Sequence, residues 1–393
     1  MTQPELAPLV IAALRQVIGA GRVALHEPWF RGNESQYVQE CISSGWVSSV
    51  GSFVDRFERD LERYTGSRHA IVVANGTVGL QVALQLCGVS PGDEVIVPAL
   101  SFVATANSVR HCGAEPHFAD SDPLTLGLSV PALAEQLSRL TEVRAQGCFN
   151  RQTGRRIAAI APMHTFGHPI DMPALLGLAR GLGVPVVEDA AESLGSFLDG
   201  RHTGTFGACG VLSFNGNKIV TTGGGGAIIT DDPGLARRAK HITTTAKLPH
   251  QWAFLHDEVA YNFRLPNLNA ALGCAQLEHL DEFVADKRRL AELYARAFAE
   301  VPSVRLFLER PNTRVNYWLQ TLILDRAVAQ QRDAILAATN ADGLMTRPTW
   351  ELLPRLPMYR NSPAMPLPVA EDLAERIVNL PSSPQLLHPQ PPA

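Results

Sequence analysis

The chain has 393 residues and a net charge of −4, with 46% hydrophobic and 18% charged residues, which is typical of a globular protein. No long run of one charge sign predicts a nucleic-acid surface or a membrane patch, and no apolar run approaches the roughly 20 residues of a membrane span. Six scattered cysteines without a CxxC pair predict neither a metal site nor a disulfide framework, so we expect a protein of the reducing cytoplasm.

The N-terminal segment, residues 1–25, contains the apolar stretch VIAALRQVIGAGRVAL. Arg15 interrupts this stretch, and no charged leader or cleavage site frames it. The pattern therefore favours an amphipathic helix over a signal peptide.

Within residues 26–245, and from residue 70 onward, the chain alternates between short β-branched runs and helical segments of roughly ten to fifteen residues. The runs AIVVA, VIVPA, IAAIAPM and VPVVEDA predict strands, and the segments between them predict helices. Apolar runs without alternation are typical of strands that are covered on both faces. The pattern indicates a large α/β domain with a mostly parallel central sheet.

The pattern changes after residue 245. Residues 267–298 predict long amphipathic helix, VNYWLQTLIL predicts a strand, and RDAILAATNADG predicts a helix that ends at glycine. We therefore expect residues 246–393 to form a smaller C-terminal α+β domain.

The stretch ANGTVGL joins a predicted strand to a predicted helix at Asn75, Gly76 and Thr77. Backbone amides at a helix N-terminus, with a hydroxyl beside them, can bind a phosphate. A tight turn in which Thr77 caps the helix is the alternative interpretation.

Two further residues follow predicted strands, at the edge of the sheet where ligands collect. Asp189 ends the run VPVVED, where its carboxylate can hold a proton on a heteroaromatic nitrogen or cap the next helix. Glu188 should point to the opposite face, so the two carboxylates do not form a general acid/base couple. Phe102 can stack on a flat ring or pack in the core.

The stretch SFNGNKIVTTGGGGAIIT places Lys218 between small polar residues and four glycines. A partly desolvated lysine can form a Schiff base, whereas an isolated lysine is ordinarily a solvated one. Ser213 and Asn215 are small donors within reach of a phosphate. The glycines permit close backbone approach or serve backbone geometry alone.

These segments, together with GWVSSVG and YNFRLPNLNAALGCAQL, resemble the fold-type I enzymes that depend on pyridoxal phosphate. Within them the chain resembles the DegT/StrS-type sugar-nucleotide aminotransferases, from about Trp29 to Ser383. The resemblance implies that Lys218 carries pyridoxal phosphate and that Asp189 pairs with its ring nitrogen. It implies a homodimer in which Asn262 reaches the cofactor phosphate of the neighbouring subunit. The implied cofactor-binding residues are Gly76, Thr77, Phe102, Asp189, Glu192, Ser213, Asn215, Lys218 and Asn262.

Two departures from the broad family pattern point to a subgroup. FNGNK stands where many relatives have a histidine-proline pair, and Glu192 stands where many have glutamine or histidine. These features resemble the enzymes that act on UDP-linked 4-keto-6-deoxy-N-acetylhexosamine in bacillosamine-type and legionaminic-acid-type pathways.

The resemblance implies transfer of an amino group, from glutamate by family analogy, to C4 of the sugar, with pyridoxal phosphate cycling through pyridoxamine phosphate. The alternatives are transfer to a 3-keto sugar nucleotide, a lyase or dehydratase reaction, and a non-catalytic regulatory protein of the same fold. Lys218 argues against the family's dehydratases, which carry histidine at that position.

Substrate contacts are expected at the sheet edge and in neighbouring loops. Each candidate has an alternative role. The tryptophans can pack in the protein, the histidine can have a structural role and the arginine can be solvated. The candidate substrate-binding residues are Trp46, Ser48, Ser49, His164, Arg347 and Trp350.

Overall fold

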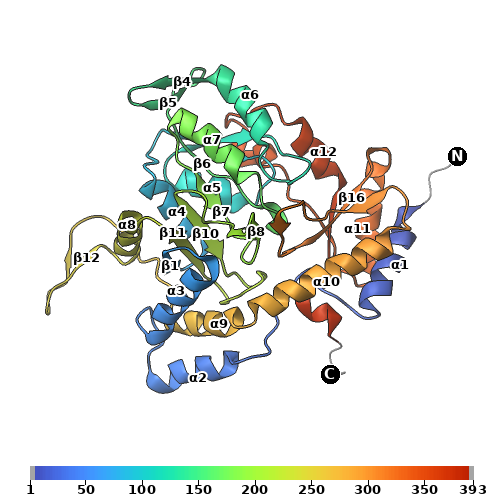
Figure 1. The fold of residues 1–393 in the computed structure, drawn as a ribbon, viewed down its shortest axis with the longest axis horizontal. Helices are drawn as coiled ribbons and strands as arrows, with labels where there is room; N and C mark the ends of the chain where they lie inside the picture. The colour runs from blue at the N-terminus through green and yellow to red at the C-terminus, as the bar shows by residue number, and fades with distance from the viewer. Residues whose placement is uncertain (1–4, 389–393) are drawn as a thin grey trace.

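A mostly parallel sheet forms the centre of the computed structural model, which describes residues 5–388 (Figure 1). One part has the order β1-β11-β10-β7, and the other has the order β3-β2-β6. Parallel bridges from Ile160 to Val186 and from Met163 to Asp189 connect the two parts. The strands are β1 (His69–Val73), β2 (Glu94–Pro98), β3 (Glu115–Ala119), β6 (Ile157–Ile160), β7 (Val187–Asp189), β10 (Cys209–Ser213) and β11 (Gly226–Thr230).

Strand β11 is antiparallel to both of its neighbours, whereas the pairs β10–β7, β2–β3 and β2–β6 are parallel. The expectation of a mostly parallel sheet in an α/β fold is therefore confirmed, with one reversed strand. The reversal places the glycine run that precedes β11 beside the carboxyl end of β10.

Helices cover both faces of this sheet (Figure 1). On β1, Ile71 and Val73 pack in the cluster that contains Leu80 of α4, while Val72 packs in the cluster that contains Phe57 of α3. This explains the apolar runs without alternation. The helices of this region are α2 (Glu34–Ser44), α3 (Ser52–Thr65), α4 (Gly76–Leu86), α5 (Val103–His111), α6 (Val130–Leu140), α7 (Met172–Leu182), α8 (Pro233–Thr243) and α9 (Asn267–Leu277).

The C-terminal region is built around an antiparallel sheet of order β14-β16-β18-β17, as expected for a smaller α+β unit. Helix α10 runs from the end of α9 to this region (Figure 1). The elements are α10 (Leu280–Phe298), β14 (Val304–Leu306), β16 (Gln320–Leu324), α11 (Arg332–Ala341), β17 (Arg347–Pro348), α12 (Pro368–Arg376) and β18 (Ile377–Leu380).

The expected N-terminal helix is present as α1 (Leu6–Ile18), and its apolar face packs on α10 and α11. Leu6, Val10 and Leu14 are fully buried there. The division of the chain at residues 25 and 245 stays a prediction.

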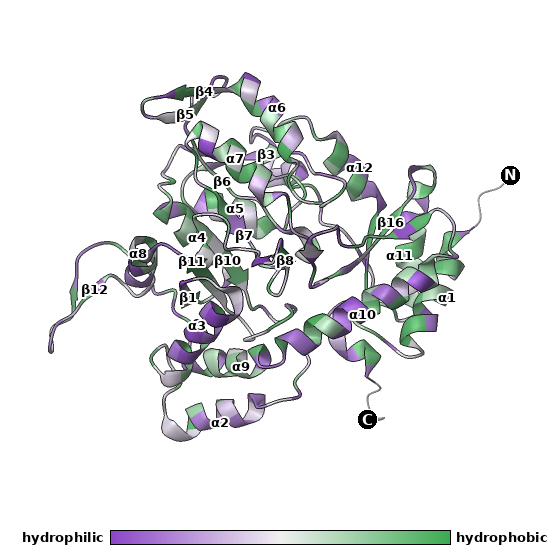
Figure 2. Cartoon of the chain, in the orientation of Figure 1, coloured by the Kyte–Doolittle hydropathy of each residue, from purple (hydrophilic) through white to green (hydrophobic). Residues whose placement is uncertain are grey.

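Short hairpins lie at the periphery of the body, and the hairpin of β12 and β13 extends away from it (Figure 1). Figure 2 shows hydrophobic strands at the centre of the body and hydrophilic residues along α3. No helix in residues 5–388 is both long and apolar enough to cross a membrane. The minor strands are β4 (Thr141–Arg144), β5 (Gly147–Asn150), β8 (Phe197–Leu198), β9 (Arg201–His202), β12 (Lys247–Leu248), β13 (Leu255–His256) and β15 (Thr313–Arg314).

Candidate active site

The turn between β1 and α4 presents backbone amides at a helix N-terminus. Asn75 caps α4, because its side-chain oxygen accepts a hydrogen bond from the Val78 amide at 3.0 Å. The first hydrogen bond along the helix runs from the Gly79 amide to the Asn75 carbonyl, so the amides of Gly76 and Thr77 precede it. These two amides, at the positive end of the helix dipole, suit an anion.

Ser213 and Gly226 lie against this turn, at the paired ends of β10 and β11. A Cβ atom placed on Gly76 would lie 3.1 Å from the Ser213 Cβ. A Cβ atom on Gly226 would lie 2.7 Å from both the Asn75 carbonyl carbon and the Gly76 nitrogen. Glycine at 226 therefore allows β11 to pass directly beside the start of α4, which is the close backbone approach that the sequence suggested.

Lys218 lies in a turn that follows β10, and its side chain is only 11% exposed. The turn is held by a hydrogen bond from the Lys218 amide to the Asn215 carbonyl at 2.9 Å and by one from Trp318 Nε1 to the Asn217 carbonyl at 2.8 Å. The Lys218 Nζ lies 3.8 Å from the centre of a Trp318 ring. This setting differs from that of a solvated surface lysine.

Asp189 ends β7 and is 2% exposed. Its Oδ2 accepts a hydrogen bond from the Thr105 hydroxyl at 2.6 Å, and its Oδ1 accepts one from the Ala191 amide at 3.2 Å. Burial raises the pKa of Asp189, while these two hydrogen bonds and the charge of Lys218 oppose that rise. Asp189 is the last residue of β7, so its side chain lies at the carboxyl end of the strand, where it lines the cavity.

Glu192 is a second buried carboxylate beside Lys218. Its Oε1 lies 3.3 Å from the Lys218 Nζ, and its Oε2 accepts a hydrogen bond from the Phe166 amide at 3.0 Å. Burial raises the pKa of Glu192 to about 7, although the charge of Lys218 acts in the opposite direction. Phe166 has a φ of 54°, which is unusual for a residue other than glycine, and its hydrogen bond to Glu192 helps to hold this backbone in place.

These elements enclose a cavity of about 320 Å³. Nine of the residues expected from the sequence line it together: Gly76, Thr77, Phe102, Asp189, Glu192, Ser213, Asn215, Lys218 and Trp350. The other lining residues are Asn75, Leu80, Ala104, Met163, Ala191, Asn217 and Trp318. Amides and hydroxyls at one helix start, a buried carboxylate and a desolvated lysine match the phosphate, ring nitrogen and aldehyde of pyridoxal phosphate, so the donor set fits this cofactor.

His164 lies outside the cavity and is fully buried. Its Nε2 is 3.0 Å from Glu188 Oε2, and Glu188 also accepts hydrogen bonds from the amides of Gly204, Phe206 and Gly207. The sequence placed His164 at the ligand edge, but Met163 faces the cavity and His164 points the opposite way. This burial and this contact favour the structural role for His164, which was the alternative, and a contact to the substrate stays a prediction. Glu188 faces away from Asp189, as expected.

The other candidate residues also lie outside the cavity in the single chain. Trp46 is 59% exposed and lines a separate hollow beside Asn267, and Ser48 and Ser49 continue this loop. Arg347 is exposed and donates a hydrogen bond to Asn340 Oδ1 at 3.1 Å.

Asn262 is exposed, and its Oδ1 accepts a hydrogen bond from Arg264 Nε at 2.9 Å. It does not line the cavity of its own chain. This position is compatible with the expected contact to a neighbouring subunit, which stays a prediction.

Sequence reasoning missed Thr105, Met163, Ala191 and Trp318. Trp318 comes from the C-terminal region and reaches the cavity across a sequence distance of about a hundred residues, since its ring contacts Lys218. The aromatic strand VNYWLQTLIL was the available signal, but nothing in its pattern distinguishes a cavity tryptophan from a core one. Thr105 lies in the first turn of α5, where the sequence predicted a helix and, of its neighbours, singled out only Phe102.

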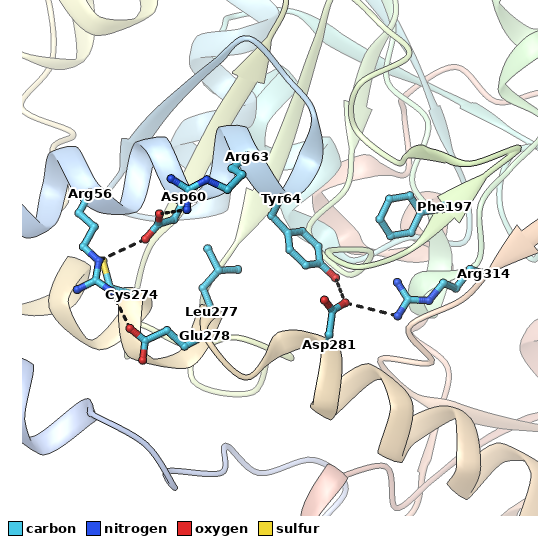
Figure 3. A pocket seen from close by; sticks show the side chains of 10 residues that line it. All are labelled: Arg56, Asp60, Arg63, Tyr64, Phe197, Cys274, Leu277, Glu278, Asp281 and Arg314. Atoms are coloured by element: carbon cyan, nitrogen blue, oxygen red, sulfur yellow. Dashed lines mark hydrogen bonds and ion pairs between the residues drawn. The ribbon is translucent and has the colours of Figure 1, made fainter.

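A larger hollow of about 550 Å³ lies between α3, α9, the start of α10 and strands β8 and β15 (Figure 3). Its charged side chains are paired with each other. Arg56 Nη2 lies 2.6 Å from Glu278 Oε1, and Arg314 Nη2 lies 3.5 Å from Asp281 Oδ1 (Figure 3). None of the residues expected to act in catalysis or binding lines this hollow.

Comparisons with known proteins show which family and which structures the chain resembles. The model of the DegT/DnrJ/EryC1/StrS aminotransferase family matches residues 29–390. The chain is 35% identical over 368 residues to a GDP-perosamine synthase from Escherichia coli O157:H7, covering 94% of this chain and 95% of that protein. It is 29% identical over 381 residues to a dTDP-4-dehydro-2,3,6-trideoxy-D-glucose 4-aminotransferase from Saccharopolyspora spinosa, covering 93% and 92%. The crystal structure of the aminotransferase TlmJ from Streptoalloteichus hindustanus superposes with a TM-score of 0.82 and 32% identity, covering 92% of this chain and 94% of that one.

Proposed function

The chain belongs to the DegT/DnrJ/EryC1/StrS aminotransferase family, and we propose that it transfers an amino group from glutamate to C4 of a nucleotide-linked 4-keto-6-deoxy sugar. The protein is a pyridoxal phosphate-dependent sugar aminotransferase. The observation that carries the proposal is the convergence of Lys218, Asp189 and the start of α4 on one cavity.

The phosphate end of the site consists of the Gly76 and Thr77 amides, the Thr77 hydroxyl and the Ser213 hydroxyl. These neutral donors, with the dipole of α4, hold a dianion without placing a further charge in the cavity. Asn215 lies in the same wall. Phe102 lines the cavity at the start of α5 and offers a flat apolar surface to a ring.

When bound, pyridoxal phosphate supplies the carbonyl group that carries the amine and a ring that takes up an electron pair. Asp189 would hold a proton on the ring nitrogen, since its buried carboxylate lines the same cavity. Lys218, which lines the cavity, would move the proton from Cα of the amino donor to the carbon that receives the amine. Glu192 Oε1 lies 3.3 Å from the Lys218 Nζ, and when it is ionised it balances the charge of this little-exposed lysine.

Transfer to C4 is supported by the printed name of one relative, the 4-aminotransferase that acts on a dTDP-4-dehydro sugar. We propose a UDP-linked N-acetylhexosamine as the substrate, on the resemblance of GWVSSVG, FNGNK and Glu192 to that subgroup. A GDP-linked sugar is the second candidate, and it is favoured by the 35% identity to a GDP-perosamine synthase.

A half-reaction tests the substrate. The pyridoxamine-loaded protein is mixed with UDP-linked and GDP-linked 4-keto-6-deoxy sugars and with a 3-keto sugar nucleotide, and the return of the aldehyde-form absorbance is followed. We expect the fastest return with the UDP-linked 4-keto sugar. A faster return with the GDP-linked sugar would transfer the assignment to the second candidate, and no return with any of them would contradict the proposed function.

We also propose that the enzyme is a homodimer whose sites are completed by the partner's chain. Three large apolar side chains are exposed in the hairpin β12–β13 and in the segment that follows it in the chain. The exposed fractions of Trp252, Phe254 and Val259 are 75%, 78% and 98%. Apolar side chains clustered on a projecting segment are typical of an interface. Asn262 follows this segment, where the family resemblance assigns it to the neighbouring site.

Subunit mixing tests this arrangement. Lys218→Ala and Asn262→Ala proteins are each expected to be nearly inactive, whereas a mixed dimer regains one complete site, with Lys218 from one chain and Asn262 from the other. Activity that stays at the level of the separate variants after unfolding and joint refolding would contradict the shared site.

A cytoplasmic location belongs to the same proposal and is supported by the six unpaired cysteines.

A further inference from the structure

Behind Asp189, on the side that faces the protein interior, lies a short row of hydroxyl groups. Thr105 Oγ1 is 2.6 Å from Asp189 Oδ2, and Ser101 Oγ is 2.8 Å from Thr105 Oγ1. Ser101 Oγ also lies 3.0 Å from the Met163 sulfur. Ser101 is fully buried and Thr105 is 1% exposed, so both hydroxyls are shielded from bulk water.

The ionisation of Asp189 determines in which direction the hydroxyls of this row donate their hydrogen bonds. A carboxylate only accepts hydrogen bonds, so the Thr105 hydroxyl must donate to it, and Ser101 can then donate to the Thr105 oxygen. A proton on Oδ2 would reverse both bonds and leave Ser101 donating to the Met163 thioether, which is a weak acceptor. A proton on Oδ1 would compete with the Ala191 amide, which donates to that oxygen.

We propose that Thr105, supported by Ser101, is a positioning residue that keeps Asp189 in its ionised, accepting form, so that Asp189 can hold a proton on the ring nitrogen of bound pyridoxal phosphate. The inference rests on the proposed pairing of Asp189 with this nitrogen. Burial alone favours the neutral acid at Asp189, and hydrogen bonds to an ionised group are stronger than those to a neutral one. Burial destabilises the ionised form of Asp189, and the hydrogen bond from the hydroxyl row offsets part of this destabilisation. Cooperativity along the row strengthens the hydrogen bond to Asp189.

Nitrogen-15 NMR of labelled pyridoxal phosphate bound to the full chain tests this inference, since the chemical shift reports whether the ring nitrogen carries a proton. We expect a protonated nitrogen in the parent protein and in Thr105→Ser, which keeps the hydroxyl. In Thr105→Val, which keeps the side-chain shape, we expect the shift to move toward the unprotonated value. Ser101→Ala removes only the supporting hydroxyl, and we expect a smaller movement in the same direction. It also provides the test if the valine variant does not fold.

A binding measurement separates this role from a structural one. In Thr105→Val the dissociation constant of pyridoxal phosphate should rise roughly tenfold, while that of an analogue with carbon in place of the ring nitrogen stays unchanged. Quenching of the fluorescence of Trp318 and Trp350, which line the cavity, reports both constants. An equal loss of affinity for both ligands would show a structural role and overturn the inference.

Asp189→Asn separates the inference from the assignment on which it rests. If this variant leaves the bound nitrogen protonated, the pairing of Asp189 with the ring is wrong. If it removes the proton while Thr105→Val and Ser101→Ala both leave it in place, the pairing stands and the role of the hydroxyl row is overturned.

Discussion

The cavity beside Lys218 and the hollow of Figure 3 differ in how they treat charge. The hollow is larger, about 550 Å³ against 320 Å³, and its arginines and carboxylates neutralise one another near solvent. In the cavity, Asp189 and Glu192 are at most 2% exposed and face a desolvated lysine. Because charge is costly where water is excluded, a buried set of this kind indicates chemistry, whereas volume alone does not.

The largest expected effect that would break this comparison is at Lys218. Lys218→Ala should lower the rate of amine transfer at least roughly a thousandfold and abolish the covalent label that borohydride fixes with pyridoxal phosphate, because no other lysine lines the cavity in the described residues. Mass spectrometry of the reduced protein checks the label. The matched control is Lys240→Ala on α8, an exposed lysine paired with Glu58, which should retain both label and turnover. Label in the Lys218 variant would contradict the assignment.

The next effect concerns Asp189. Asp189→Ala should reduce turnover by roughly a hundredfold or more, since the preorganised negative charge at the ring nitrogen is lost, while the midpoint of thermal unfolding changes much less. The control is Asp281→Asn in the larger hollow, where the carboxylate is 72% exposed. Similar turnover losses in the two variants would mean that burial does not mark the functional carboxylate.

Glu192→Gln tests the buried carboxylate through the pH dependence of the free energy of unfolding. The pKa of Glu192 is raised from 4.5 to about 7, so between these values the folded chain holds a proton that the unfolded chain has released. The stabilisation from this proton is complete below about pH 4.5 and is lost as the pH rises to 7. The variant cannot ionise, so its free energy of unfolding relative to the parent should increase across this window by up to roughly 3 kcal/mol.

Urea unfolding of the cofactor-free proteins at pH 5 and pH 8 measures this change. A difference between Glu192→Gln and the parent that is the same at both pH values would mean that Glu192 titrates normally in the folded chain.

The smallest effect is expected in the larger hollow. Arg314→Ala breaks an ion pair whose side chains are 41% and 72% exposed, and such pairs contribute less than about 1 kcal/mol. Turnover should be unchanged, and denaturant unfolding should detect at most this small loss. A large loss of turnover would give the hollow a function that its paired charges do not suggest.

Much of the site could be predicted because its residues follow strands whose ends meet at one edge. Asp189, Ser213 and the turn at Gly76 are fixed by local pattern and by the rule for ligands in α/β sheets. The reversed direction of β11 could not be read from its apolar run AIIT, since parallel and antiparallel buried strands have the same composition.

Residues that reach the cavity through tertiary packing were also beyond sequence reasoning. Trp318 approaches Lys218 from the C-terminal region, and Thr105 bonds to Asp189 across 84 positions of sequence. His164 follows a strand that ends at the correct edge, but its side chain is buried beside Glu188 and does not line the cavity. The side that a loop residue faces depends on its backbone angles, for which the sequence has no periodic signal.

The approach of Gly226 to Asn75 and Gly76 has a mechanical consequence. The backbones of β11 and of the start of α4 approach each other so closely that neither can move toward the other. We therefore expect the phosphate end of the site to be set when the sheet assembles, before a ligand arrives. A single added methyl group at position 226 would have to separate the two segments, and we expect the anchoring of the phosphate to be lost before the fold.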